Sequence, residues 1–287
     1  MATELMPGQR RLSPLSVGAD VVLVVWFVFS LFPILWMVLL SLKTQADQTS
    51  TYFAFSPTLD NFRTVFTDGE RLTSVDFGSA ILNSAIMCVG AVLVSLVIGI
   101  PSAYAAGRFQ YKGSNDVMFT ILSFRFAPEL MVIVPLFIIY NQLGLNDTKL
   151  GMIWVLQLVT MPLVVWILRS YFQDMPAELE QAALLDGYTR RRAFLMVALP
   201  LVRPGIAASA LLAFIFAWNN YVFPLILTSS NSTPATVAVT SFLGGGGQAY
   251  YNLTAAAALI AALPPLLVAL SIQRYLVRGL SFGAVKA

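Results

Sequence analysis

The sequence contains no histidine and a single cysteine, Cys88, which lies within an apolar run. Without histidine the chain lacks the commonest metal ligand and the commonest general base. One cysteine cannot form an internal disulfide bond. No Gly-Lys pair occurs, and this excludes the phosphate-binding loop of nucleotide-hydrolysing proteins, G-x-x-x-x-G-K-S/T. We therefore expect a chain that is not an enzyme and that holds no metal and no cofactor of its own.

Charged residues are also scarce. They make up 11% of the 287 residues, against about 25% in soluble domains, whereas 58% of the residues are apolar and the mean hydropathy is +0.78. These values predict an all-α, polytopic membrane protein that forms a single transmembrane domain over residues 1–287. Six runs have the length, about 20 residues, that a helix needs to cross the hydrocarbon core. They lie at about 21–40, 80–104, 117–140, 151–168, 205–228 and 255–272.

The first run is too long for the core of a signal peptide and is not followed by a cleavage site, so we expect it to remain as a membrane helix. If the N-terminus lies inside, the inner segments hold twelve Lys and Arg residues and the outer segments hold four. Because basic residues favour the cytoplasmic side, both termini are expected in the cytoplasm and the chain in the cell membrane.

The inner segment 176–200 has a sequence that predicts a structure of its own. Pro176 suits the first turn of a helix, the run 177-AELEQAALL-185 favours that helix, and Gly187 suits the left-handed turn after it. Thr189 is a good cap for a second short helix, which Pro200 should end. Such a helix–turn–helix either docks a cytoplasmic partner or rests as an amphipathic segment on the membrane surface.

This segment resembles the signature loop of ABC importer permeases, E-A-A-x-x-x-G followed about nine residues later by an apolar residue, x and L-P. The chain matches at Ala182, Ala183, Gly187, Val197, Leu199 and Pro200. It departs at Gln181, where the motif has Glu, although Glu180 comes directly before. Four more stretches resemble maltose-type carbohydrate permeases in the order of that family: 55-FSPTLDNFRTVF-66, 101-PSAYAAGRFQYKG-113, 214-FIFAWNNYVFPL-225 and 273-QRYLVRGLSFGAVKA-287.

The resemblance implies a type I ABC importer permease fold that forms half of a pore. The implied partners are a second homologous permease, a cytoplasmic ATPase dimer that binds ATP and Mg, an extracytoplasmic solute-binding protein and membrane lipid, with no nucleic acid. The coupling loop, at about 173–203, would contact the ATPase. Its implied contact residues are Glu180, Gln181, Ala182, Ala183, Asp186, Gly187, Arg190 and Pro200. The implied substrate is a sugar or a related polyol, and the alternative is a non-carbohydrate solute such as a glycerol phosphodiester.

Polar side chains inside the spans are candidates for a substrate pathway, because a polar solute needs hydrogen-bonding groups that face a cavity. Asn219, Asn220 and Tyr221 lie near the middle of the fifth run, Trp218 offers a flat face for a sugar ring, and Gln157 lies in the fourth run. The alternative role for these residues is hydrogen bonding between helices.

Arg125 and Glu129 are the only charged residues well inside a span. Their spacing of four predicts one helix face, and Pro128 between them predicts a kink. Because a charge in a span is costly, the two side chains are expected to form either a gate or substrate contact, or a mutually neutralised structural pair.

The outer stretch 241-SFLGGGGQAYYN-252 is a candidate contact for the binding protein, through Gly245, Gly246, Gln248 and Tyr250, or else a plain flexible connector. An ion-coupled secondary transporter would usually need acidic sites in its spans and internal repeats, for which Glu129 alone is a poor basis. A membrane enzyme would need a nucleophile and base or a metal site. A purely structural anchor would not need the helix–turn–helix.

Overall fold

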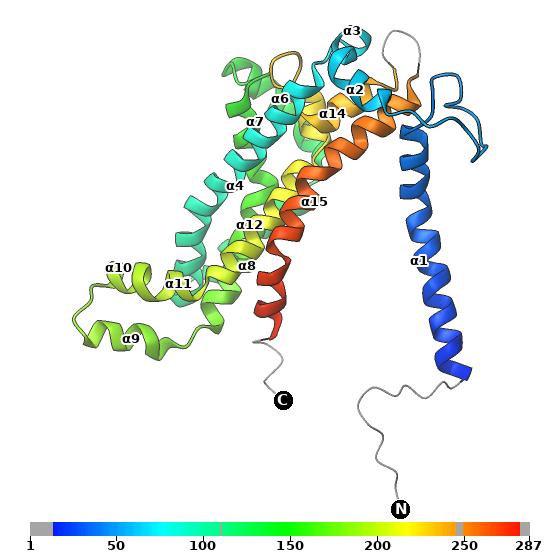
Figure 1. Cartoon of the computed structure of the whole chain (residues 1–287). Helices are drawn as coiled ribbons and strands as arrows, with labels where there is room; N and C mark the ends of the chain where they lie inside the picture. Colours follow the sequence, from blue (N-terminus) through cyan, green and yellow to red (C-terminus); the bar gives the residue numbers. More distant parts are fainter. Residues whose placement is uncertain (1–13, 110, 245–248, 282–287) are drawn as a thin grey trace, which may run out of the picture.

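The computed structural model describes residues 14–109, 111–244 and 249–281, and every regular element in those ranges is helical (Figure 1). Three helices are long and apolar enough to cross a membrane unbroken: α1 (Pro14–Ser41), α4 (Phe77–Arg108) and α15 (Tyr251–Ser281). Three bent pairs of helices raise this number to six if each pair is one span. The all-α, polytopic fold predicted from the sequence is confirmed.

The remaining elements are shorter. The segment between α1 and α4 forms α2 (Asp60–Thr67) and α3 (Gly69–Thr73). The middle of the chain forms α5 (Ser114–Ser123), the 3₁₀ turn η1 (Phe124–Phe126), α6 (Glu129–Gln142), α7 (Lys149–Val155) and α8 (Gln157–Asp174). Then follow α9 (Ala177–Leu185), α10 (Arg190–Ala193), the π-helical turn η2 (Phe194–Ala198), α11 (Leu199–Leu201), α12 (Arg203–Trp218), α13 (Val222–Leu227) and α14 (Ala235–Ser241).

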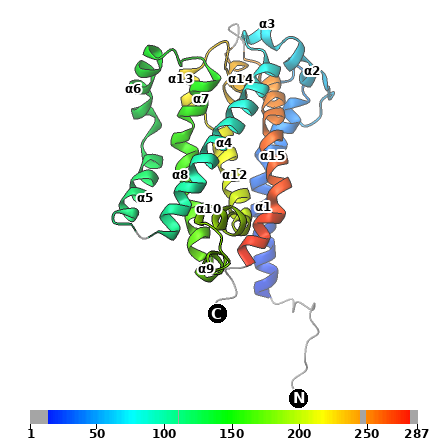
Figure 2. The same cartoon turned by 90° about the vertical axis from the view of Figure 1, so that its left-hand side faces the viewer.

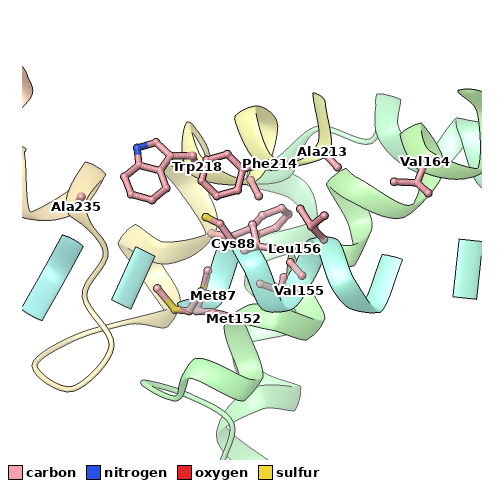
Figure 3. Close-up of a cluster of buried hydrophobic side chains, with 14 of the residues drawn as sticks. Met87, Cys88, Met152, Val155, Leu156, Val164, Ala213, Phe214, Trp218 and Ala235 are labelled. Carbon is pink, nitrogen blue, oxygen red and sulfur yellow. The ribbon is translucent and has the colours of Figure 1, made fainter. Parts of the chain in front are cut away.

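The centre of the molecule is the packing of α4, α8 and α12, with α15 against α12. Small residues make this close approach possible, as is common between membrane helices. A Cβ atom on Gly99 would lie 2.8 Å from Val164 Cγ1, and one on Gly205 would lie 2.6 Å from the ring of Tyr171. Figure 3 shows the buried cluster where α4, α7, α8 and α12 meet, with Cys88 and Trp218 among its members.

The third predicted span is broken rather than continuous. The helix that holds Arg125 ends at Phe126 and a new one starts at Glu129, and the two axes differ by 93°. Pro128 occupies the N-cap of α6, where its missing N–H costs nothing and its ring forces the preceding residue out of the helical region. The predicted kink is confirmed, but the prediction that Arg125 and Glu129 share one helix face was wrong.

Helix α1 diverges from the rest of the bundle, and its side chains from residue 21 to residue 35 are exposed (Figure 1). It packs against α15, and its C-terminal end is also attached by a small amide network. Asn61 Nδ2 donates to the carbonyl oxygens of Ser41 and Lys43, both at 2.7 Å, and Asn252 Nδ2 donates to Asn61 Oδ1 at 2.8 Å. The network joins the end of α1 to α2 and to the beginning of α15.

Candidate functional site

The segment 176–200, which we call the coupling segment, projects from one end of the bundle (Figures 1 and 2). Helix α9 ends in a Schellman turn: Tyr188 N–H donates to Ala183 O at 3.0 Å and Gly187 N–H donates to Leu184 O at 3.1 Å. Gly187 has φ +86°, the left-handed conformation that the turn requires. Thr189 Oγ1 accepts from the amide of Arg192 at 3.3 Å and so caps α10. The predicted helix–glycine turn–helix is confirmed.

Pro200 does not end the second helix, contrary to the prediction. Residues 194–198 form a π-helical turn in which the amide of Leu199 donates to Phe194 O, five residues earlier. Pro200 directly follows this turn, and the helical run continues one residue further, to Leu201. The chain changes direction only at Val202, by 69°, before α12 begins.

One acidic side chain attaches the coupling segment to the bundle. Glu180 is buried and forms an ion pair with Arg108 at the end of α4, with Nη2–Oε2 at 2.5 Å and Nε–Oε2 at 2.6 Å. Tyr104 Oη donates to Glu180 Oε1 at 2.7 Å, and Arg108 Nη1 donates to Met175 O at 2.9 Å. Charge-assisted bonds of this kind are stronger and shorter than neutral ones. Glu180 therefore acts within this chain, although the sequence predicted it as a contact to a partner.

Arg108 and Tyr104 were missed as site residues. They precede Glu180 by 72 and 76 positions, so no local pattern joins them. The sequence offered one signal, which was complementary charge. Arg108 ends a span, and the helix 177–185 contains two glutamates that could pair with it.

The coupling segment has several exposed apolar side chains. Leu185 is 89% exposed, and Leu184 and Met196 are also exposed. Gln181, Ala182, Asp186 and Arg190 are exposed as well, whereas Ala183 is buried. A cavity of about 360 Å³ separates the segment from the end of α4. Exposed apolar groups gathered in this way mark interaction surfaces.

A second group of predicted residues meets at the break between η1 and α6, around a cavity of about 270 Å³. The Arg125 guanidinium lies 4.1 Å from the ring centroid of Phe216, and its Nη1 donates to Val159 O at 3.2 Å. Glu129 Oε1 accepts from Asn220 Nδ2 at 2.9 Å. The expected neutralised pair is not formed, since the one ion pair among the described residues is Arg108–Glu180. Arg125 and Glu129 instead line one cavity from two helices.

The break between α12 and α13 places the Trp218–Tyr221 run in three different environments. Asn219 is exposed, and its Nδ2 donates to Ile215 O at 2.9 Å. Asn220 is buried beside Glu129, and Tyr221 Oη lies 3.3 Å from Thr240 Oγ1. Trp218 is only 3% exposed and its Nε1 donates to Ala261 O on α15 at 3.0 Å. Trp218 thus has no open face for a sugar ring, contrary to the expectation.

Gln157 is also part of the packing between helices. Its Nε2 donates to Ala91 O at 3.1 Å and to Ile153 O at 2.9 Å, while its Oε1 accepts from Ser95 Oγ at 2.6 Å. These bonds join α4 to the α7–α8 break and leave the amide no free position toward a cavity.

Of the residues predicted to contact a binding protein, Gly245, Gly246 and Gln248 lie outside the described residues. Tyr250 is half-buried, and its amide donates to Phe242 O at 2.9 Å. Contact between this stretch and a binding protein stays a prediction.

Comparison with known proteins places these features in a family. Residues 95–282 match the family described as binding-protein-dependent transport system inner membrane component. The chain is 34% identical over 261 residues to a trehalose transport system permease protein of Mycobacterium tuberculosis, covering 90% of this chain and 93% of that protein. It is 30% identical over 263 residues to a trehalose/maltose transport system permease protein of Thermococcus litoralis, covering 90% and 92%.

A solved structure has a similar fold. It is a bacterial ABC transporter involved in the import of the acidic polysaccharide alginate, with a TM-score of 0.74 and 21% identity, over 93% of this chain and 99% of that chain. At this identity the likeness concerns the fold alone.

Proposed function

The chain belongs to the family of binding-protein-dependent transport system inner membrane components, and from this membership we propose that it is a permease subunit of an ATP-driven importer for a sugar or related polyol. The names of its relatives, which transport trehalose, maltose or diacetylchitobiose, support the substrate class. In this role the chain catalyses no reaction of its own, and ATP is hydrolysed by a separate subunit.

The coupling segment is the surface that receives the ATPase. The observation that carries this assignment is the exposed apolar tip of the coupling segment around Leu185. Two structural features hold this segment in a fixed position relative to the bundle. The Glu180–Arg108 ion pair attaches α9 to α4, and the Gly187 turn fixes α10 against α9. Because the coupling segment is rigid, a displacement of the segment by the ATPase would be transmitted to α4, to which it is bonded. A flexible loop would change its own conformation instead.

The end with the coupling segment is then the cytoplasmic end. The start of α1 and the end of α15 lie at this same end (Figure 1), which supports cytoplasmic termini. The arginines of the coupling segment, Arg190 to Arg192, agree with this orientation because basic residues favour the cytoplasmic side. The extracytoplasmic solute-binding protein would meet the opposite end, where α2, α3 and α14 lie (Figure 1).

A second, homologous permease completes the pore. Helix α1 exposes apolar side chains along most of its length, so lipid or another subunit must cover it in the membrane. The cavity between η1, α6 and α12 supplies the polar groups for a hydroxylated solute. Arg125 and Glu129 line this cavity, and we assign them to the substrate pathway together with Asn219 and Tyr221, which are exposed at the break between α12 and α13.

The proposed function is tested by reconstituting the assembled importer with its binding protein in proteoliposomes. A panel of disaccharides, polyols and a glycerol phosphodiester is added, and ATP hydrolysis and solute uptake are measured together. We expect one carbohydrate to stimulate hydrolysis and to enter only while ATP is present. Uptake that continues after ATP is exhausted, while a proton gradient remains, would refute an ATP-driven importer. Stimulation by the phosphodiester alone would refute the substrate class.

A further inference from the structure

An aromatic cluster at the coupling end of the bundle joins the second half of the coupling segment to two spans. Phe194 opens the π-helical turn η2, and its ring centroid lies 4.5 Å from that of Tyr104 on α4 and 6.4 Å from that of Phe172 on α8. Tyr104 and Phe172 meet edge to face at 5.3 Å. Aromatic pairs at these distances attract one another beyond the apolar area that they bury. The turn η2 is therefore held on α4 and on α8 together.

Tyr104 takes part in both attachments of the coupling segment. Its ring contacts Phe194, and its hydroxyl donates to Glu180 Oε1 at 2.7 Å. Phe172 is fully buried, and a Cβ atom on Gly107 would lie 3.0 Å from Phe172 Cβ, so α4 and α8 approach each other closely at this point. Close-packed interiors transmit strain because side chains have no free volume in which to move aside. A displacement of the segment must therefore reach both helices.

Helix α8 extends from this cluster to the cavity that Arg125 lines, and Figure 2 shows it rising from the coupling segment through the bundle. It is one continuous helix of 18 residues, which corresponds to a length of about 27 Å. Near its beginning, Leu158 and Val159 line the cavity, and Val159 O accepts from Arg125 Nη1 at 3.2 Å. Packed side chains and rigid helices are the elements that can couple distant sites. One such element here contacts the coupling segment at one end and the substrate pathway at the other.

We propose that Phe194 is the positioning residue through which the coupling segment moves α8, and that α8 carries this movement to Arg125. The inference rests on the proposed function, because it requires an ATPase that displaces the segment. It adds a second route to the one through Glu180 and α4, and this second route ends at the substrate pathway. The same contacts carry the presence of a solute at Arg125 back to the ATPase.

The test uses the assembled importer with its binding protein in proteoliposomes and the solute that the wild type transports. Phe194→Leu removes the ring but keeps an apolar side chain. We expect the number of solute molecules taken up per ATP to fall about fivefold, and the stimulation of hydrolysis by solute-loaded binding protein to fall with it. The ATPase subunit should still copurify with this variant. Phe119→Leu makes the same change at an exposed position on α5 and should behave as the wild type.

Two variants of Tyr104 separate the aromatic contacts from the hydrogen bond to Glu180. Tyr104→Phe keeps the ring against Phe194 and Phe172 and loses only the hydroxyl, so uptake per ATP should stay close to the wild-type value. Tyr104→Leu loses the ring and should lower uptake per ATP as Phe194→Leu does. Equal losses in Tyr104→Phe and Tyr104→Leu would assign the effect to the hydroxyl and overturn the aromatic route.

Failure of this inference can be told apart from failure of the proposed function. If Phe194→Leu takes up as many solute molecules per ATP as the wild type, the cluster serves packing alone and the inference is overturned, while the proposed function is unaffected. Loss of the ATPase subunit from the purified Phe194→Leu complex would place Phe194 in the docking surface and would also overturn it. A wild type without ATP-dependent uptake contradicts the proposed function itself, and this inference with it.

Discussion

Glu180 and Gln181 are adjacent on α9, but Glu180 faces the bundle and Gln181 faces away from it. The motif of the family has Glu where this chain has Gln181, and Gln181 is exposed and uncharged. The neighbouring Glu180 faces the bundle and is bonded to Arg108 and Tyr104. Because a buried carboxylate needs a partner to offset its desolvation, Glu180 is not available to an ATPase. The groups of the coupling segment that remain exposed for a partner include Leu185, Asp186 and Arg190.

Gly187 gives a prediction that belongs to a single residue. Replacing it with valine should lower transport at least tenfold while ATP hydrolysis by the assembled complex continues. A non-glycine residue at φ +86° costs about 1–2 kcal/mol, and a β-branched one costs more. There is open space around the position, so the effect would come from the backbone and not from a clash.

The matched control is Gly187→Asn, since asparagine tolerates the left-handed conformation better than other residues. Uptake and hydrolysis are measured on the same proteoliposomes. The asparagine variant should retain most of the transport. If the valine variant transports as well as the wild type with its partners bound, the turn has no role in coupling.

The sequence predicted the residues of this turn because capping is local. Gly187 and Thr189 act on amides within a few positions, and each residue type has a known preference. For Trp218 and Gln157 the sequence left two roles open, and the structure shows the hydrogen bonds between helices. Whether a side chain in a span faces a cavity or another helix depends on α4 and α15, which are distant in the sequence.

At the scale of elements, proline alone does not determine where a helix breaks. Helix α4 continues through Pro101 and α8 continues through Pro162, but the chain breaks at Pro128. Membrane helices tolerate proline when neighbouring groups satisfy the freed carbonyls. The break at Pro128 creates the cavity that Arg125 and Glu129 line, and the sequence predicted the kink but not its size.

A hydrogen-bonded clasp holds together two loops, the α6–α7 loop and the α13–α14 loop. Both carboxylate oxygens of Asp147 accept from the 229–232 stretch: from Ser229 N and Oγ at 2.8 Å, from Asn231 N at 3.0 Å and Nδ2 at 2.9 Å, and from Ser232 N at 3.0 Å and Oγ at 2.8 Å. Burial alone would raise the pKa of Asp147, but these bonds outweigh it and lower the pKa.

Asp147→Asn should therefore destabilise the protein by about 2–3 kcal/mol, because an amide N–H₂ would replace an acceptor among donors. The comparison variant is Asp68→Asn, because Asp68 has an exposed carboxylate that accepts from Thr67 Oγ1. Thermal unfolding in detergent measures both.

The pH dependence of this stabilisation follows from the lowered pKa of Asp147 in the folded protein. The contribution of Asp147 to stability is complete above the ordinary carboxyl pKa and is lost only as the pH falls through the pKa of the folded state. The loss in Asp147→Asn should thus be the same at pH 5 and at pH 8, and equal stability of the two variants would contradict the clasp.

At the scale of the whole molecule, the sequence predicted six spans and a single transmembrane domain, because length and hydropathy determine what can cross a bilayer. It did not predict which helices pack together. An apolar side chain is equally suited to lipid and to another helix, so the packing of α1 against α15 and the centre formed by α4, α8 and α12 required the structure.

The central claim is that the coupling segment seats the ATPase, and site-directed cross-linking tests it most directly. Leu185→Cys places a thiol at the exposed tip. The native Cys88 is buried, so it should not react with the cross-linker. In the assembled complex, a short thiol–amine cross-linker should join residue 185 to the ATPase subunit, and Tyr52→Cys at the opposite end should give no such product. If the cysteine at residue 185 cross-links no ATPase while the complex hydrolyses ATP and transports solute, the segment is not the coupling surface and the account is contradicted.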